Sequence, residues 1–122
     1  MANDHDTTAR NVAADAVGAL CLRLALHTGD PGGANSATNE VTGGSPAYAR
    51  KACSWNAASS GSAGLASNVV FDVPGSTTVA YISGWNTAGT VRYFKKAVTS
   101  QAFAVQGTYT VLTTADINFN DA

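Results

Sequence analysis

The sequence predicts an all-β fold, an antiparallel β-sandwich or partly open barrel of about seven to eight short strands with a short N-terminal arm or helix. Three observations favour this class. Short runs alternate apolar and polar residues, as in Leu20–Thr28, where Leu20, Leu22, Leu24 and Leu26 share one face. Gly, Pro, Asn and Ser separate these runs, as turn residues do. Strand–helix–strand alternation, which would indicate a parallel sheet, is missing from the pattern.

Composition limits the classes of partner. The 122 residues suit one domain, and they are 45% hydrophobic but only 12% charged. A net charge of −1 argues against a nucleic-acid partner, and no apolar stretch is long enough to predict a membrane span. Asp4 and Asp6 precede any apolar run, which is unlike a secretory signal, so we expect synthesis in a cytoplasm.

The chain divides at about residue 20. Residues 1–19 are predicted to form a polar arm and a short helix, and residues 20–122 the β domain. Thr7 or Thr8 is a suitable cap for a helix over Ala9–Gly18, which Gly18 would end. Leu20–Thr28 follows as a strand that the strict alternation predicts to be half-buried.

The remaining strands are predicted from the same alternation. Val69, Phe71 and Val73 are expected to point inward. Val79, Tyr81 and Trp85 are expected on one face of their strand, opposite Ala80 and Ile82, and Ile117 alternates with Phe119 in the last strand. A small-residue loop is expected over Asn56–Leu65 and a tight connection over Asn86–Gly89. The predicted strands are Ala47–Trp55, Ser67–Val73, Thr77–Trp85, Thr90–Ala97, Gln101–Val105, Thr108–Leu112 and Ala115–Asn120.

Gly29–Pro46 is a loop of 18 residues without periodicity. Loops longer than about 12–15 residues are uncommon in compact domains and are usually functional or disordered. This segment is therefore the first candidate for contact with a partner.

A search for catalytic and metal sites favours structural explanations. His27 and Asp30 are spaced for a metal or an acid–base pair, but a turn before Pro31 explains Asp30 more simply. The Gly–Ser stretches lack the spacing and the following helix of a nucleophile elbow, and no phosphate-binding loop occurs. We expect no catalytic residue, no metal and no cofactor. Cys21 and Cys53 are expected to be free thiols, with a disulfide as the alternative.

Two further groups of residues each allow two interpretations. The aromatic residues are expected in the core or in a subunit interface, with an exposed carbohydrate platform around Trp55 or Trp85 as the alternative. The basic residues Arg92, Lys95 and Lys96 suit a solvated or edge-blocking strand, or else an ion pair with a partner.

Three ordered stretches resemble a family of small tailed-bacteriophage virion proteins. They are a strand end at Leu22–Gly32, a loop and strand at Asn39–Arg50, and a hairpin at Val69–Trp85. The alternating ending YTVLTTADINFN is also similar, so the resemblance extends from Leu20 to Phe119. It implies assembly into a virion and supplies no catalytic residues.

The resemblance leaves two roles open. The first is a head decoration or minor capsid protein that binds the major capsid protein or other virion proteins and stabilises the shell, as a homo-oligomer for which a trimer is one option. The second is a tail-fibre or tail-tip module that binds a host receptor or glycan. Candidate contacts with partners come from the N-terminal arm, the long loop and the strand after it: Asp4, His5, Asp6, Arg10, Asp30, Asn35, Asn39, Glu40, Tyr48 and Arg50.

Overall fold

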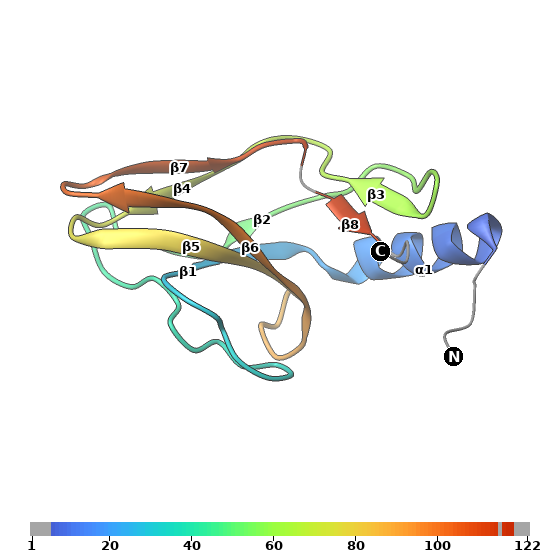
Figure 1. Ribbon diagram of the computed structural model, residues 1–122, viewed down its shortest axis with the longest axis horizontal. Helices are drawn as coiled ribbons and strands as arrows, with labels where there is room; N and C mark the ends of the chain where they lie inside the picture. The colour runs from blue at the N-terminus through green and yellow to red at the C-terminus, as the bar shows by residue number, and fades with distance from the viewer. Residues whose placement is uncertain (1–5, 115, 119–122) are drawn as a thin grey trace.

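The computed structural model describes residues 6–114 and 116–118, and within them the strands pair antiparallel, with one helix at one end of the molecule (Figure 1). This confirms the predicted all-β class with a short N-terminal helix. The elements are α1 (Thr7–Leu20), β1 (Arg23–His27), β2 (Lys51–Ala52), β3 (Ser62–Gly64), β4 (Val69–Val73), β5 (Thr77–Trp85), β6 (Arg92–Phe103), β7 (Gly107–Val111) and β8 (Asp116–Asn118).

Two layers of unequal width enclose the core. A four-stranded sheet in the order β2-β1-β5-β6 faces the two-stranded β4-β7 pair, which lies above it in Figure 1. The β3-β8 pair lies at the other end of the molecule, beside α1 (Figure 1). Both layers contribute to the main core, which consists of Leu24, Leu26, Val41, Leu65, Val69, Phe71, Val73, Val79, Ile82 and Val111.

Strand β1 is buried on both faces, so the prediction of a half-buried strand is wrong. Leu24 and Leu26 lie in the main core, and Ala25 and His27 on the opposite face are also fully buried. Alternation correctly predicted which residues share a face. It did not show that residues 28–50, called here the 28–50 loop, return over the second face and bury it.

The helix extends beyond both ends of the predicted one. Asp6 occupies the N-cap position without a side-chain cap bond, and Thr7 and Thr8 are helical. Gly18 lies within the helix instead of ending it, and its missing side chain lets Trp55 approach, since a Cβ there would lie 3.3 Å from the Cβ of Trp55. Leu20, predicted to begin the first strand, is the last helical residue.

Two predicted segments between β1 and β4 differ in the structure. The strand expected over Ala47–Trp55 is reduced to β2, and Trp55 makes an isolated bridge with Leu65. The expected loop over Asn56–Leu65 contains β3, which pairs with β8 at the far end of the sequence. Partners so distant in sequence leave no local pattern.

A register irregularity between β5 and β6 changes the faces of β5, and two predicted strands form the single strand β6. The bounds of β5 match the prediction, but the register shifts between Val79 and Tyr81. Ile82 therefore lies in the core with Val79, and the predicted opposition of these residues is wrong. The strands expected over Thr90–Ala97 and Gln101–Val105 form one strand, β6.

Other predictions for the second half are confirmed within the described residues. Val69, Phe71 and Val73 point into the core. Asn86–Gly89 makes the tight connection, with the Asn86 side chain accepting hydrogen bonds from the backbone of Thr90 and Val91. Phe119, predicted to alternate with Ile117 of β8, lies outside the described residues, as do Ala115 and Asn120. No helix in the described part of the chain is long and apolar enough to cross a membrane.

Substitution of Gly84 would test how closely β5 packs against its neighbours. A Cβ at Gly84 would overlap the ring of Phe94 and the Sγ atom of Cys21, whereas a Cβ at Gly33 would meet nothing within 4 Å. We expect Gly84→Ala to lower the free energy of unfolding by about 1–3 kcal/mol through overpacking. The Gly33→Ala control should leave it within about 0.5 kcal/mol. Urea unfolding measures both, and equal effects of the two substitutions would contradict the prediction.

Candidate functional site

The 28–50 loop follows the edge of β1 that β2 leaves unpaired. Val41 donates a backbone hydrogen bond to the carbonyl of Leu26 at 3.0 Å, and Thr28 donates one to Asn39 at 2.8 Å. The N–H of Leu26 donates to the Tyr48 hydroxyl at 2.9 Å. The longest loop predicted from the sequence is therefore fixed to the body of the protein along this edge.

A buried histidine lies beneath the 28–50 loop. His27 Nδ1 is 3.1 Å from the carbonyl oxygen of Thr38, and Nε2 is 2.7 Å from the hydroxyl of Ser83. A carbonyl oxygen only accepts, so Nδ1 carries the proton and Nε2 accepts from Ser83. The indole N–H of Trp85 donates to the same Ser83 oxygen at 2.7 Å. Every polar atom of this chain of hydrogen bonds then has a partner.

The contact between Ser83 and His27 is not arranged as a nucleophile and its base. Both residues are fully buried, so the Ser83 oxygen has no open approach for a substrate. Burial also lowers the pKa of His27, an effect that outweighs the opposing influence of the Thr38 carbonyl and of Glu40. A neutral imidazole fixed between two elements joins the loop to the sheet.

Glu40 is the second fixed point of the 28–50 loop. Its carboxylate accepts hydrogen bonds from Arg50 Nε and Nη2 and from the Tyr48 hydroxyl, all at 2.9 Å. Burial opposes ionisation of Glu40, but the hydrogen bonds from Arg50 and Tyr48 prevail and lower its pKa. The Arg50 guanidinium also lies 4.0 Å from the ring centroid of Trp85, a cation–π geometry.

The tip of the 28–50 loop is held by the start of β6. The Arg92 guanidinium donates to the carbonyls of Ser36 and Gly32, at 2.6 and 2.9 Å, and Lys95 Nζ lies 2.7 Å from the Asp30 carboxylate. The backbone N–H of Arg92 donates to the side chain of Asn35 at 2.9 Å. Two of the three basic residues singled out in the sequence thus stabilise the loop.

The structure gives most of the candidate contact residues an internal role. Asn39 donates to the carbonyl of Asp30, so Asp30, Asn35, Asn39, Glu40, Tyr48 and Arg50 all make contacts within the chain. Asp6 and Arg10 lie at the start of α1, and Asp4 and His5 lie outside the described residues. Contact of these ten residues with a partner stays a prediction.

His27 and Asp30 do not converge on one site. His27 contacts Thr38 and Ser83, while Asp30 accepts from Lys95 and from the backbone of Gly32. No cluster of three or more potential metal ligands occurs among the described residues. The nearest feature to a reactive site that sequence reasoning missed is the His27–Ser83 contact, whose two members are 56 residues apart.

Aromatic side chains pack within the body of the protein. Trp85 is only 2% exposed, so it cannot form a carbohydrate platform. Trp55 is partly buried, meets Phe94 edge to face, and donates its indole N–H to the carbonyl of Cys21 at 2.7 Å. Cys21 and Cys53 are free thiols; their mutual hydrogen bond and burial raise the pKa of Cys21.

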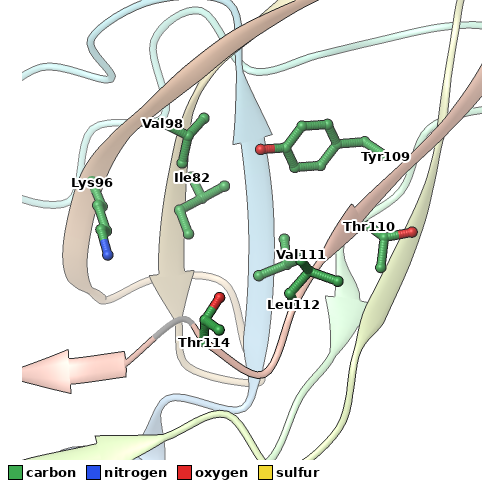
Figure 2. Close-up of a pocket in the computed structure, with 8 residues that line it drawn as sticks. All are labelled: Ile82, Lys96, Val98, Tyr109, Thr110, Val111, Leu112 and Thr114. Atoms are coloured by element: carbon green, nitrogen blue, oxygen red, sulfur yellow. The ribbon is translucent and has the colours of Figure 1, made fainter.

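Apart from the separate exposed residues Val70, Val91 and Val105, apolar surface remains exposed in two places. On α1, Val12 and Leu20 are 64% and 55% exposed, and exposed Ala9, Ala16 and Ala19 lie on the same side of the helix. The other place is a pocket of about 210 Å³ between the two layers (Figure 2), which sequence reasoning also missed. Ile82, Lys96, Val98, Tyr109, Thr110, Val111, Leu112 and Thr114 line this pocket.

Removing the charge of Glu40 or that of Asp30, the two carboxylates of the 28–50 loop, should change the free energy of unfolding by different amounts. Glu40 and Arg50 are 19% and 23% exposed, so Glu40→Gln should lower the free energy of unfolding by about 1–3 kcal/mol, since a hydrogen-bonded charge pair loses one partner. Asp30→Asn is the matched control, because the Asp30–Lys95 pair is exposed to solvent, and it should produce no measurable loss. Denaturant unfolding compares the two variants, and an equal loss in both would contradict this interpretation.

We expect the buried His27 to make the free energy of unfolding depend on pH. Its pKa is lowered in the folded protein, so the unfolded chain takes up the proton first as the pH falls. The contribution is complete above about pH 6.5, and below that the free energy of unfolding should fall by up to about 1.4 kcal/mol per pH unit. His27→Gln should remove this slope, and His5→Gln, which replaces the other histidine, should retain it. An NMR titration showing His27 protonated near pH 6.5 in the folded protein would contradict the prediction.

Comparison with known proteins supplies the family. A family model described as podophage GP4 fiber I protein gp80 matches residues 4–119, nearly the whole chain. No curated protein and no solved structure matches the chain. This result confirms the resemblance to tailed-phage virion proteins that the three motifs indicated. The chain belongs to the podophage GP4 fiber I protein gp80 family and is a component of the virion, where it associates with other virion proteins.

Proposed function

We propose that this chain is a structural module of a podophage fibre, which acts by binding other virion proteins and performs no reaction. The observation that carries this proposal is the family match over residues 4–119. The description of that family as a fiber protein favours a fibre over decoration of the capsid. Binding that occurs only in the assembled particle would stabilise that state by mass action.

The architecture supports a module rather than a shaft. A shaft needs length from coiled-coil heptads or repeated β rungs, and the described residues form short strands in two unequal layers. The length of the fibre would then come from other subunits or from stacking of copies. The ordered 28–50 loop and the outer side of α1 are the surfaces that this module offers for assembly.

Self-association is part of this proposal. The outer side of α1 carries Ala9, Val12, Ala16 and Ala19 at spacings of three, four and three, the pattern of a helix–helix seam. Val12 is 64% exposed on this side, so its burial in a contact with another subunit would be favourable. Packing of α1 against copies of itself, as in a trimer, would cover these residues.

The location of the protein on the particle tests the proposed function. We expect gel densitometry of purified virions to give a few copies per particle, and an antibody against the protein to label fibres in electron micrographs. Hundreds of copies per particle with label spread over the head would overturn the fibre proposal. That result would establish the capsid-decoration role, because a shell offers many equivalent sites.

A further inference from the structure

The two layers of the sandwich leave a seam open between β6 and β7. In the described residues β6 is an edge of the four-stranded sheet, and β7 has only β4 as a partner. Residues of β5, β6 and the segment around β7 line the pocket of about 210 Å³ in this seam (Figure 2). Unpaired strand edges beside a pocket are a template for an added strand.

The floor of the seam belongs to the core. Ile82 and Val111 are members of the main core cluster, and Val98 and Tyr109 pack against it. Leu112, at the rim of the same pocket, is 54% exposed. An apolar side chain that enters this pocket would therefore complete a core that the narrow second layer does not cover.

Lys96 restricts what can enter the seam. It pairs with Ile82 across the sheet and lines the pocket with it. Arg92 and Lys95 bind the 28–50 loop, but Lys96 makes no hydrogen bond or ion pair with any residue that the structure describes. A purely apolar strand would bury the unpaired ammonium group, so the occupant must bring a carboxylate beside its apolar side chain.

This chain contains a segment with that chemistry beyond its described residues. Phe119 and Asp121 are two positions apart, so they project to the same side of an extended chain. Lys96 and Val98 of β6 have the same spacing and both line the pocket. Antiparallel addition to β6 in one register sets Phe119 beside Val98 and Asp121 beside Lys96.

We propose that the β6–β7 seam binds residues 119–121 of a second copy of this chain, with Phe119 in the pocket and Asp121 paired with Lys96. A second copy is the expected source because β8, which pairs with β3 beside α1, carries the chain away from the pocket-lining Thr114 before residue 119 is reached (Figure 1). The contact adds a strand exchange to the proposed self-association. It does not depend on where the fibre lies in the virion.

Cross-linking between two variants of the full chain, each with one cysteine added to the native Cys21 and Cys53, tests this proposal. The register places Asn120 opposite Ala97, an exposed residue of β6, so Ala97→Cys and Asn120→Cys are mixed under mild oxidation. We expect a disulfide between the two introduced cysteines, mapped by mass spectrometry of the linked peptides. Neither variant carries both introduced cysteines, so a contact within one chain cannot form this product.

A matched control and two further variants make the result specific. Val105→Cys, at a residue 76% exposed in the turn after β6, should link to Asn120→Cys about tenfold less efficiently than Ala97→Cys does. Phe119→Ala in the Asn120→Cys chain should reduce linkage by about tenfold, because the pocket loses its apolar occupant. Lys96→Asp should also reduce linkage, and Asp121→Lys in the partner chain should restore it.

Three outcomes would overturn the proposal. The first is linkage at Ala97 no greater than at Val105, and the second is charge reversal without rescue. The third is a double variant, Ala97→Cys with Asn120→Cys, that closes only an internal disulfide, which would assign the seam to the tail of the same chain. Circular dichroism of each variant verifies folding. Failure of the fibre proposal would instead appear in the labelling of virions, so the two failures are distinguishable.

Discussion

The burial of both faces of β1 is the constraint on which the rest of the structure depends. One face meets the β4-β7 layer through Leu24 and Leu26, and the other bears Ala25 and His27 beneath the 28–50 loop. A buried imidazole is tolerated only when both ring nitrogens have partners. The Thr38 carbonyl and the Ser83 hydroxyl supply them, so His27 fixes the loop to the sheet while it remains neutral.

The loop that results is a rigid surface rather than a mobile arm. Its charges are used within the chain: Glu40 holds Arg50 and Tyr48, and Arg92 holds the loop tip through backbone carbonyls. A surface fixed in this way loses little conformational entropy when a partner binds it. In the proposed fibre module, that ordering would favour assembly with other virion proteins.

The unequal layers have a second consequence. Two strands cannot cover a four-stranded sheet, so among the described residues β6 and β7 keep unpaired edges and the core reaches the surface between them. Most proteins protect such edges with charge, and Lys96 has that effect here against purely apolar strands. Proteins that assemble use the same arrangement to select a partner, since only an occupant with a matching carboxylate would pair with the ammonium group that it covers.

The sequence by itself determined the local features: the all-β class, the bounds of β5, the inward residues of β4, and the family through three ordered motifs. Alternation and turn residues act over a few positions, so they show which side chains share a face. Only the tertiary structure decided what covers each face, because β3 pairs with β8 and His27 meets Ser83 across long separations in sequence. For the same reason the seam pocket was missed, since its walls come from β5, β6 and the segment around β7. The candidate residues of the loop were correctly placed on a loop, but the bonds of Asn35 and Asp30 to Arg92 and Lys95 join residues more than fifty positions apart.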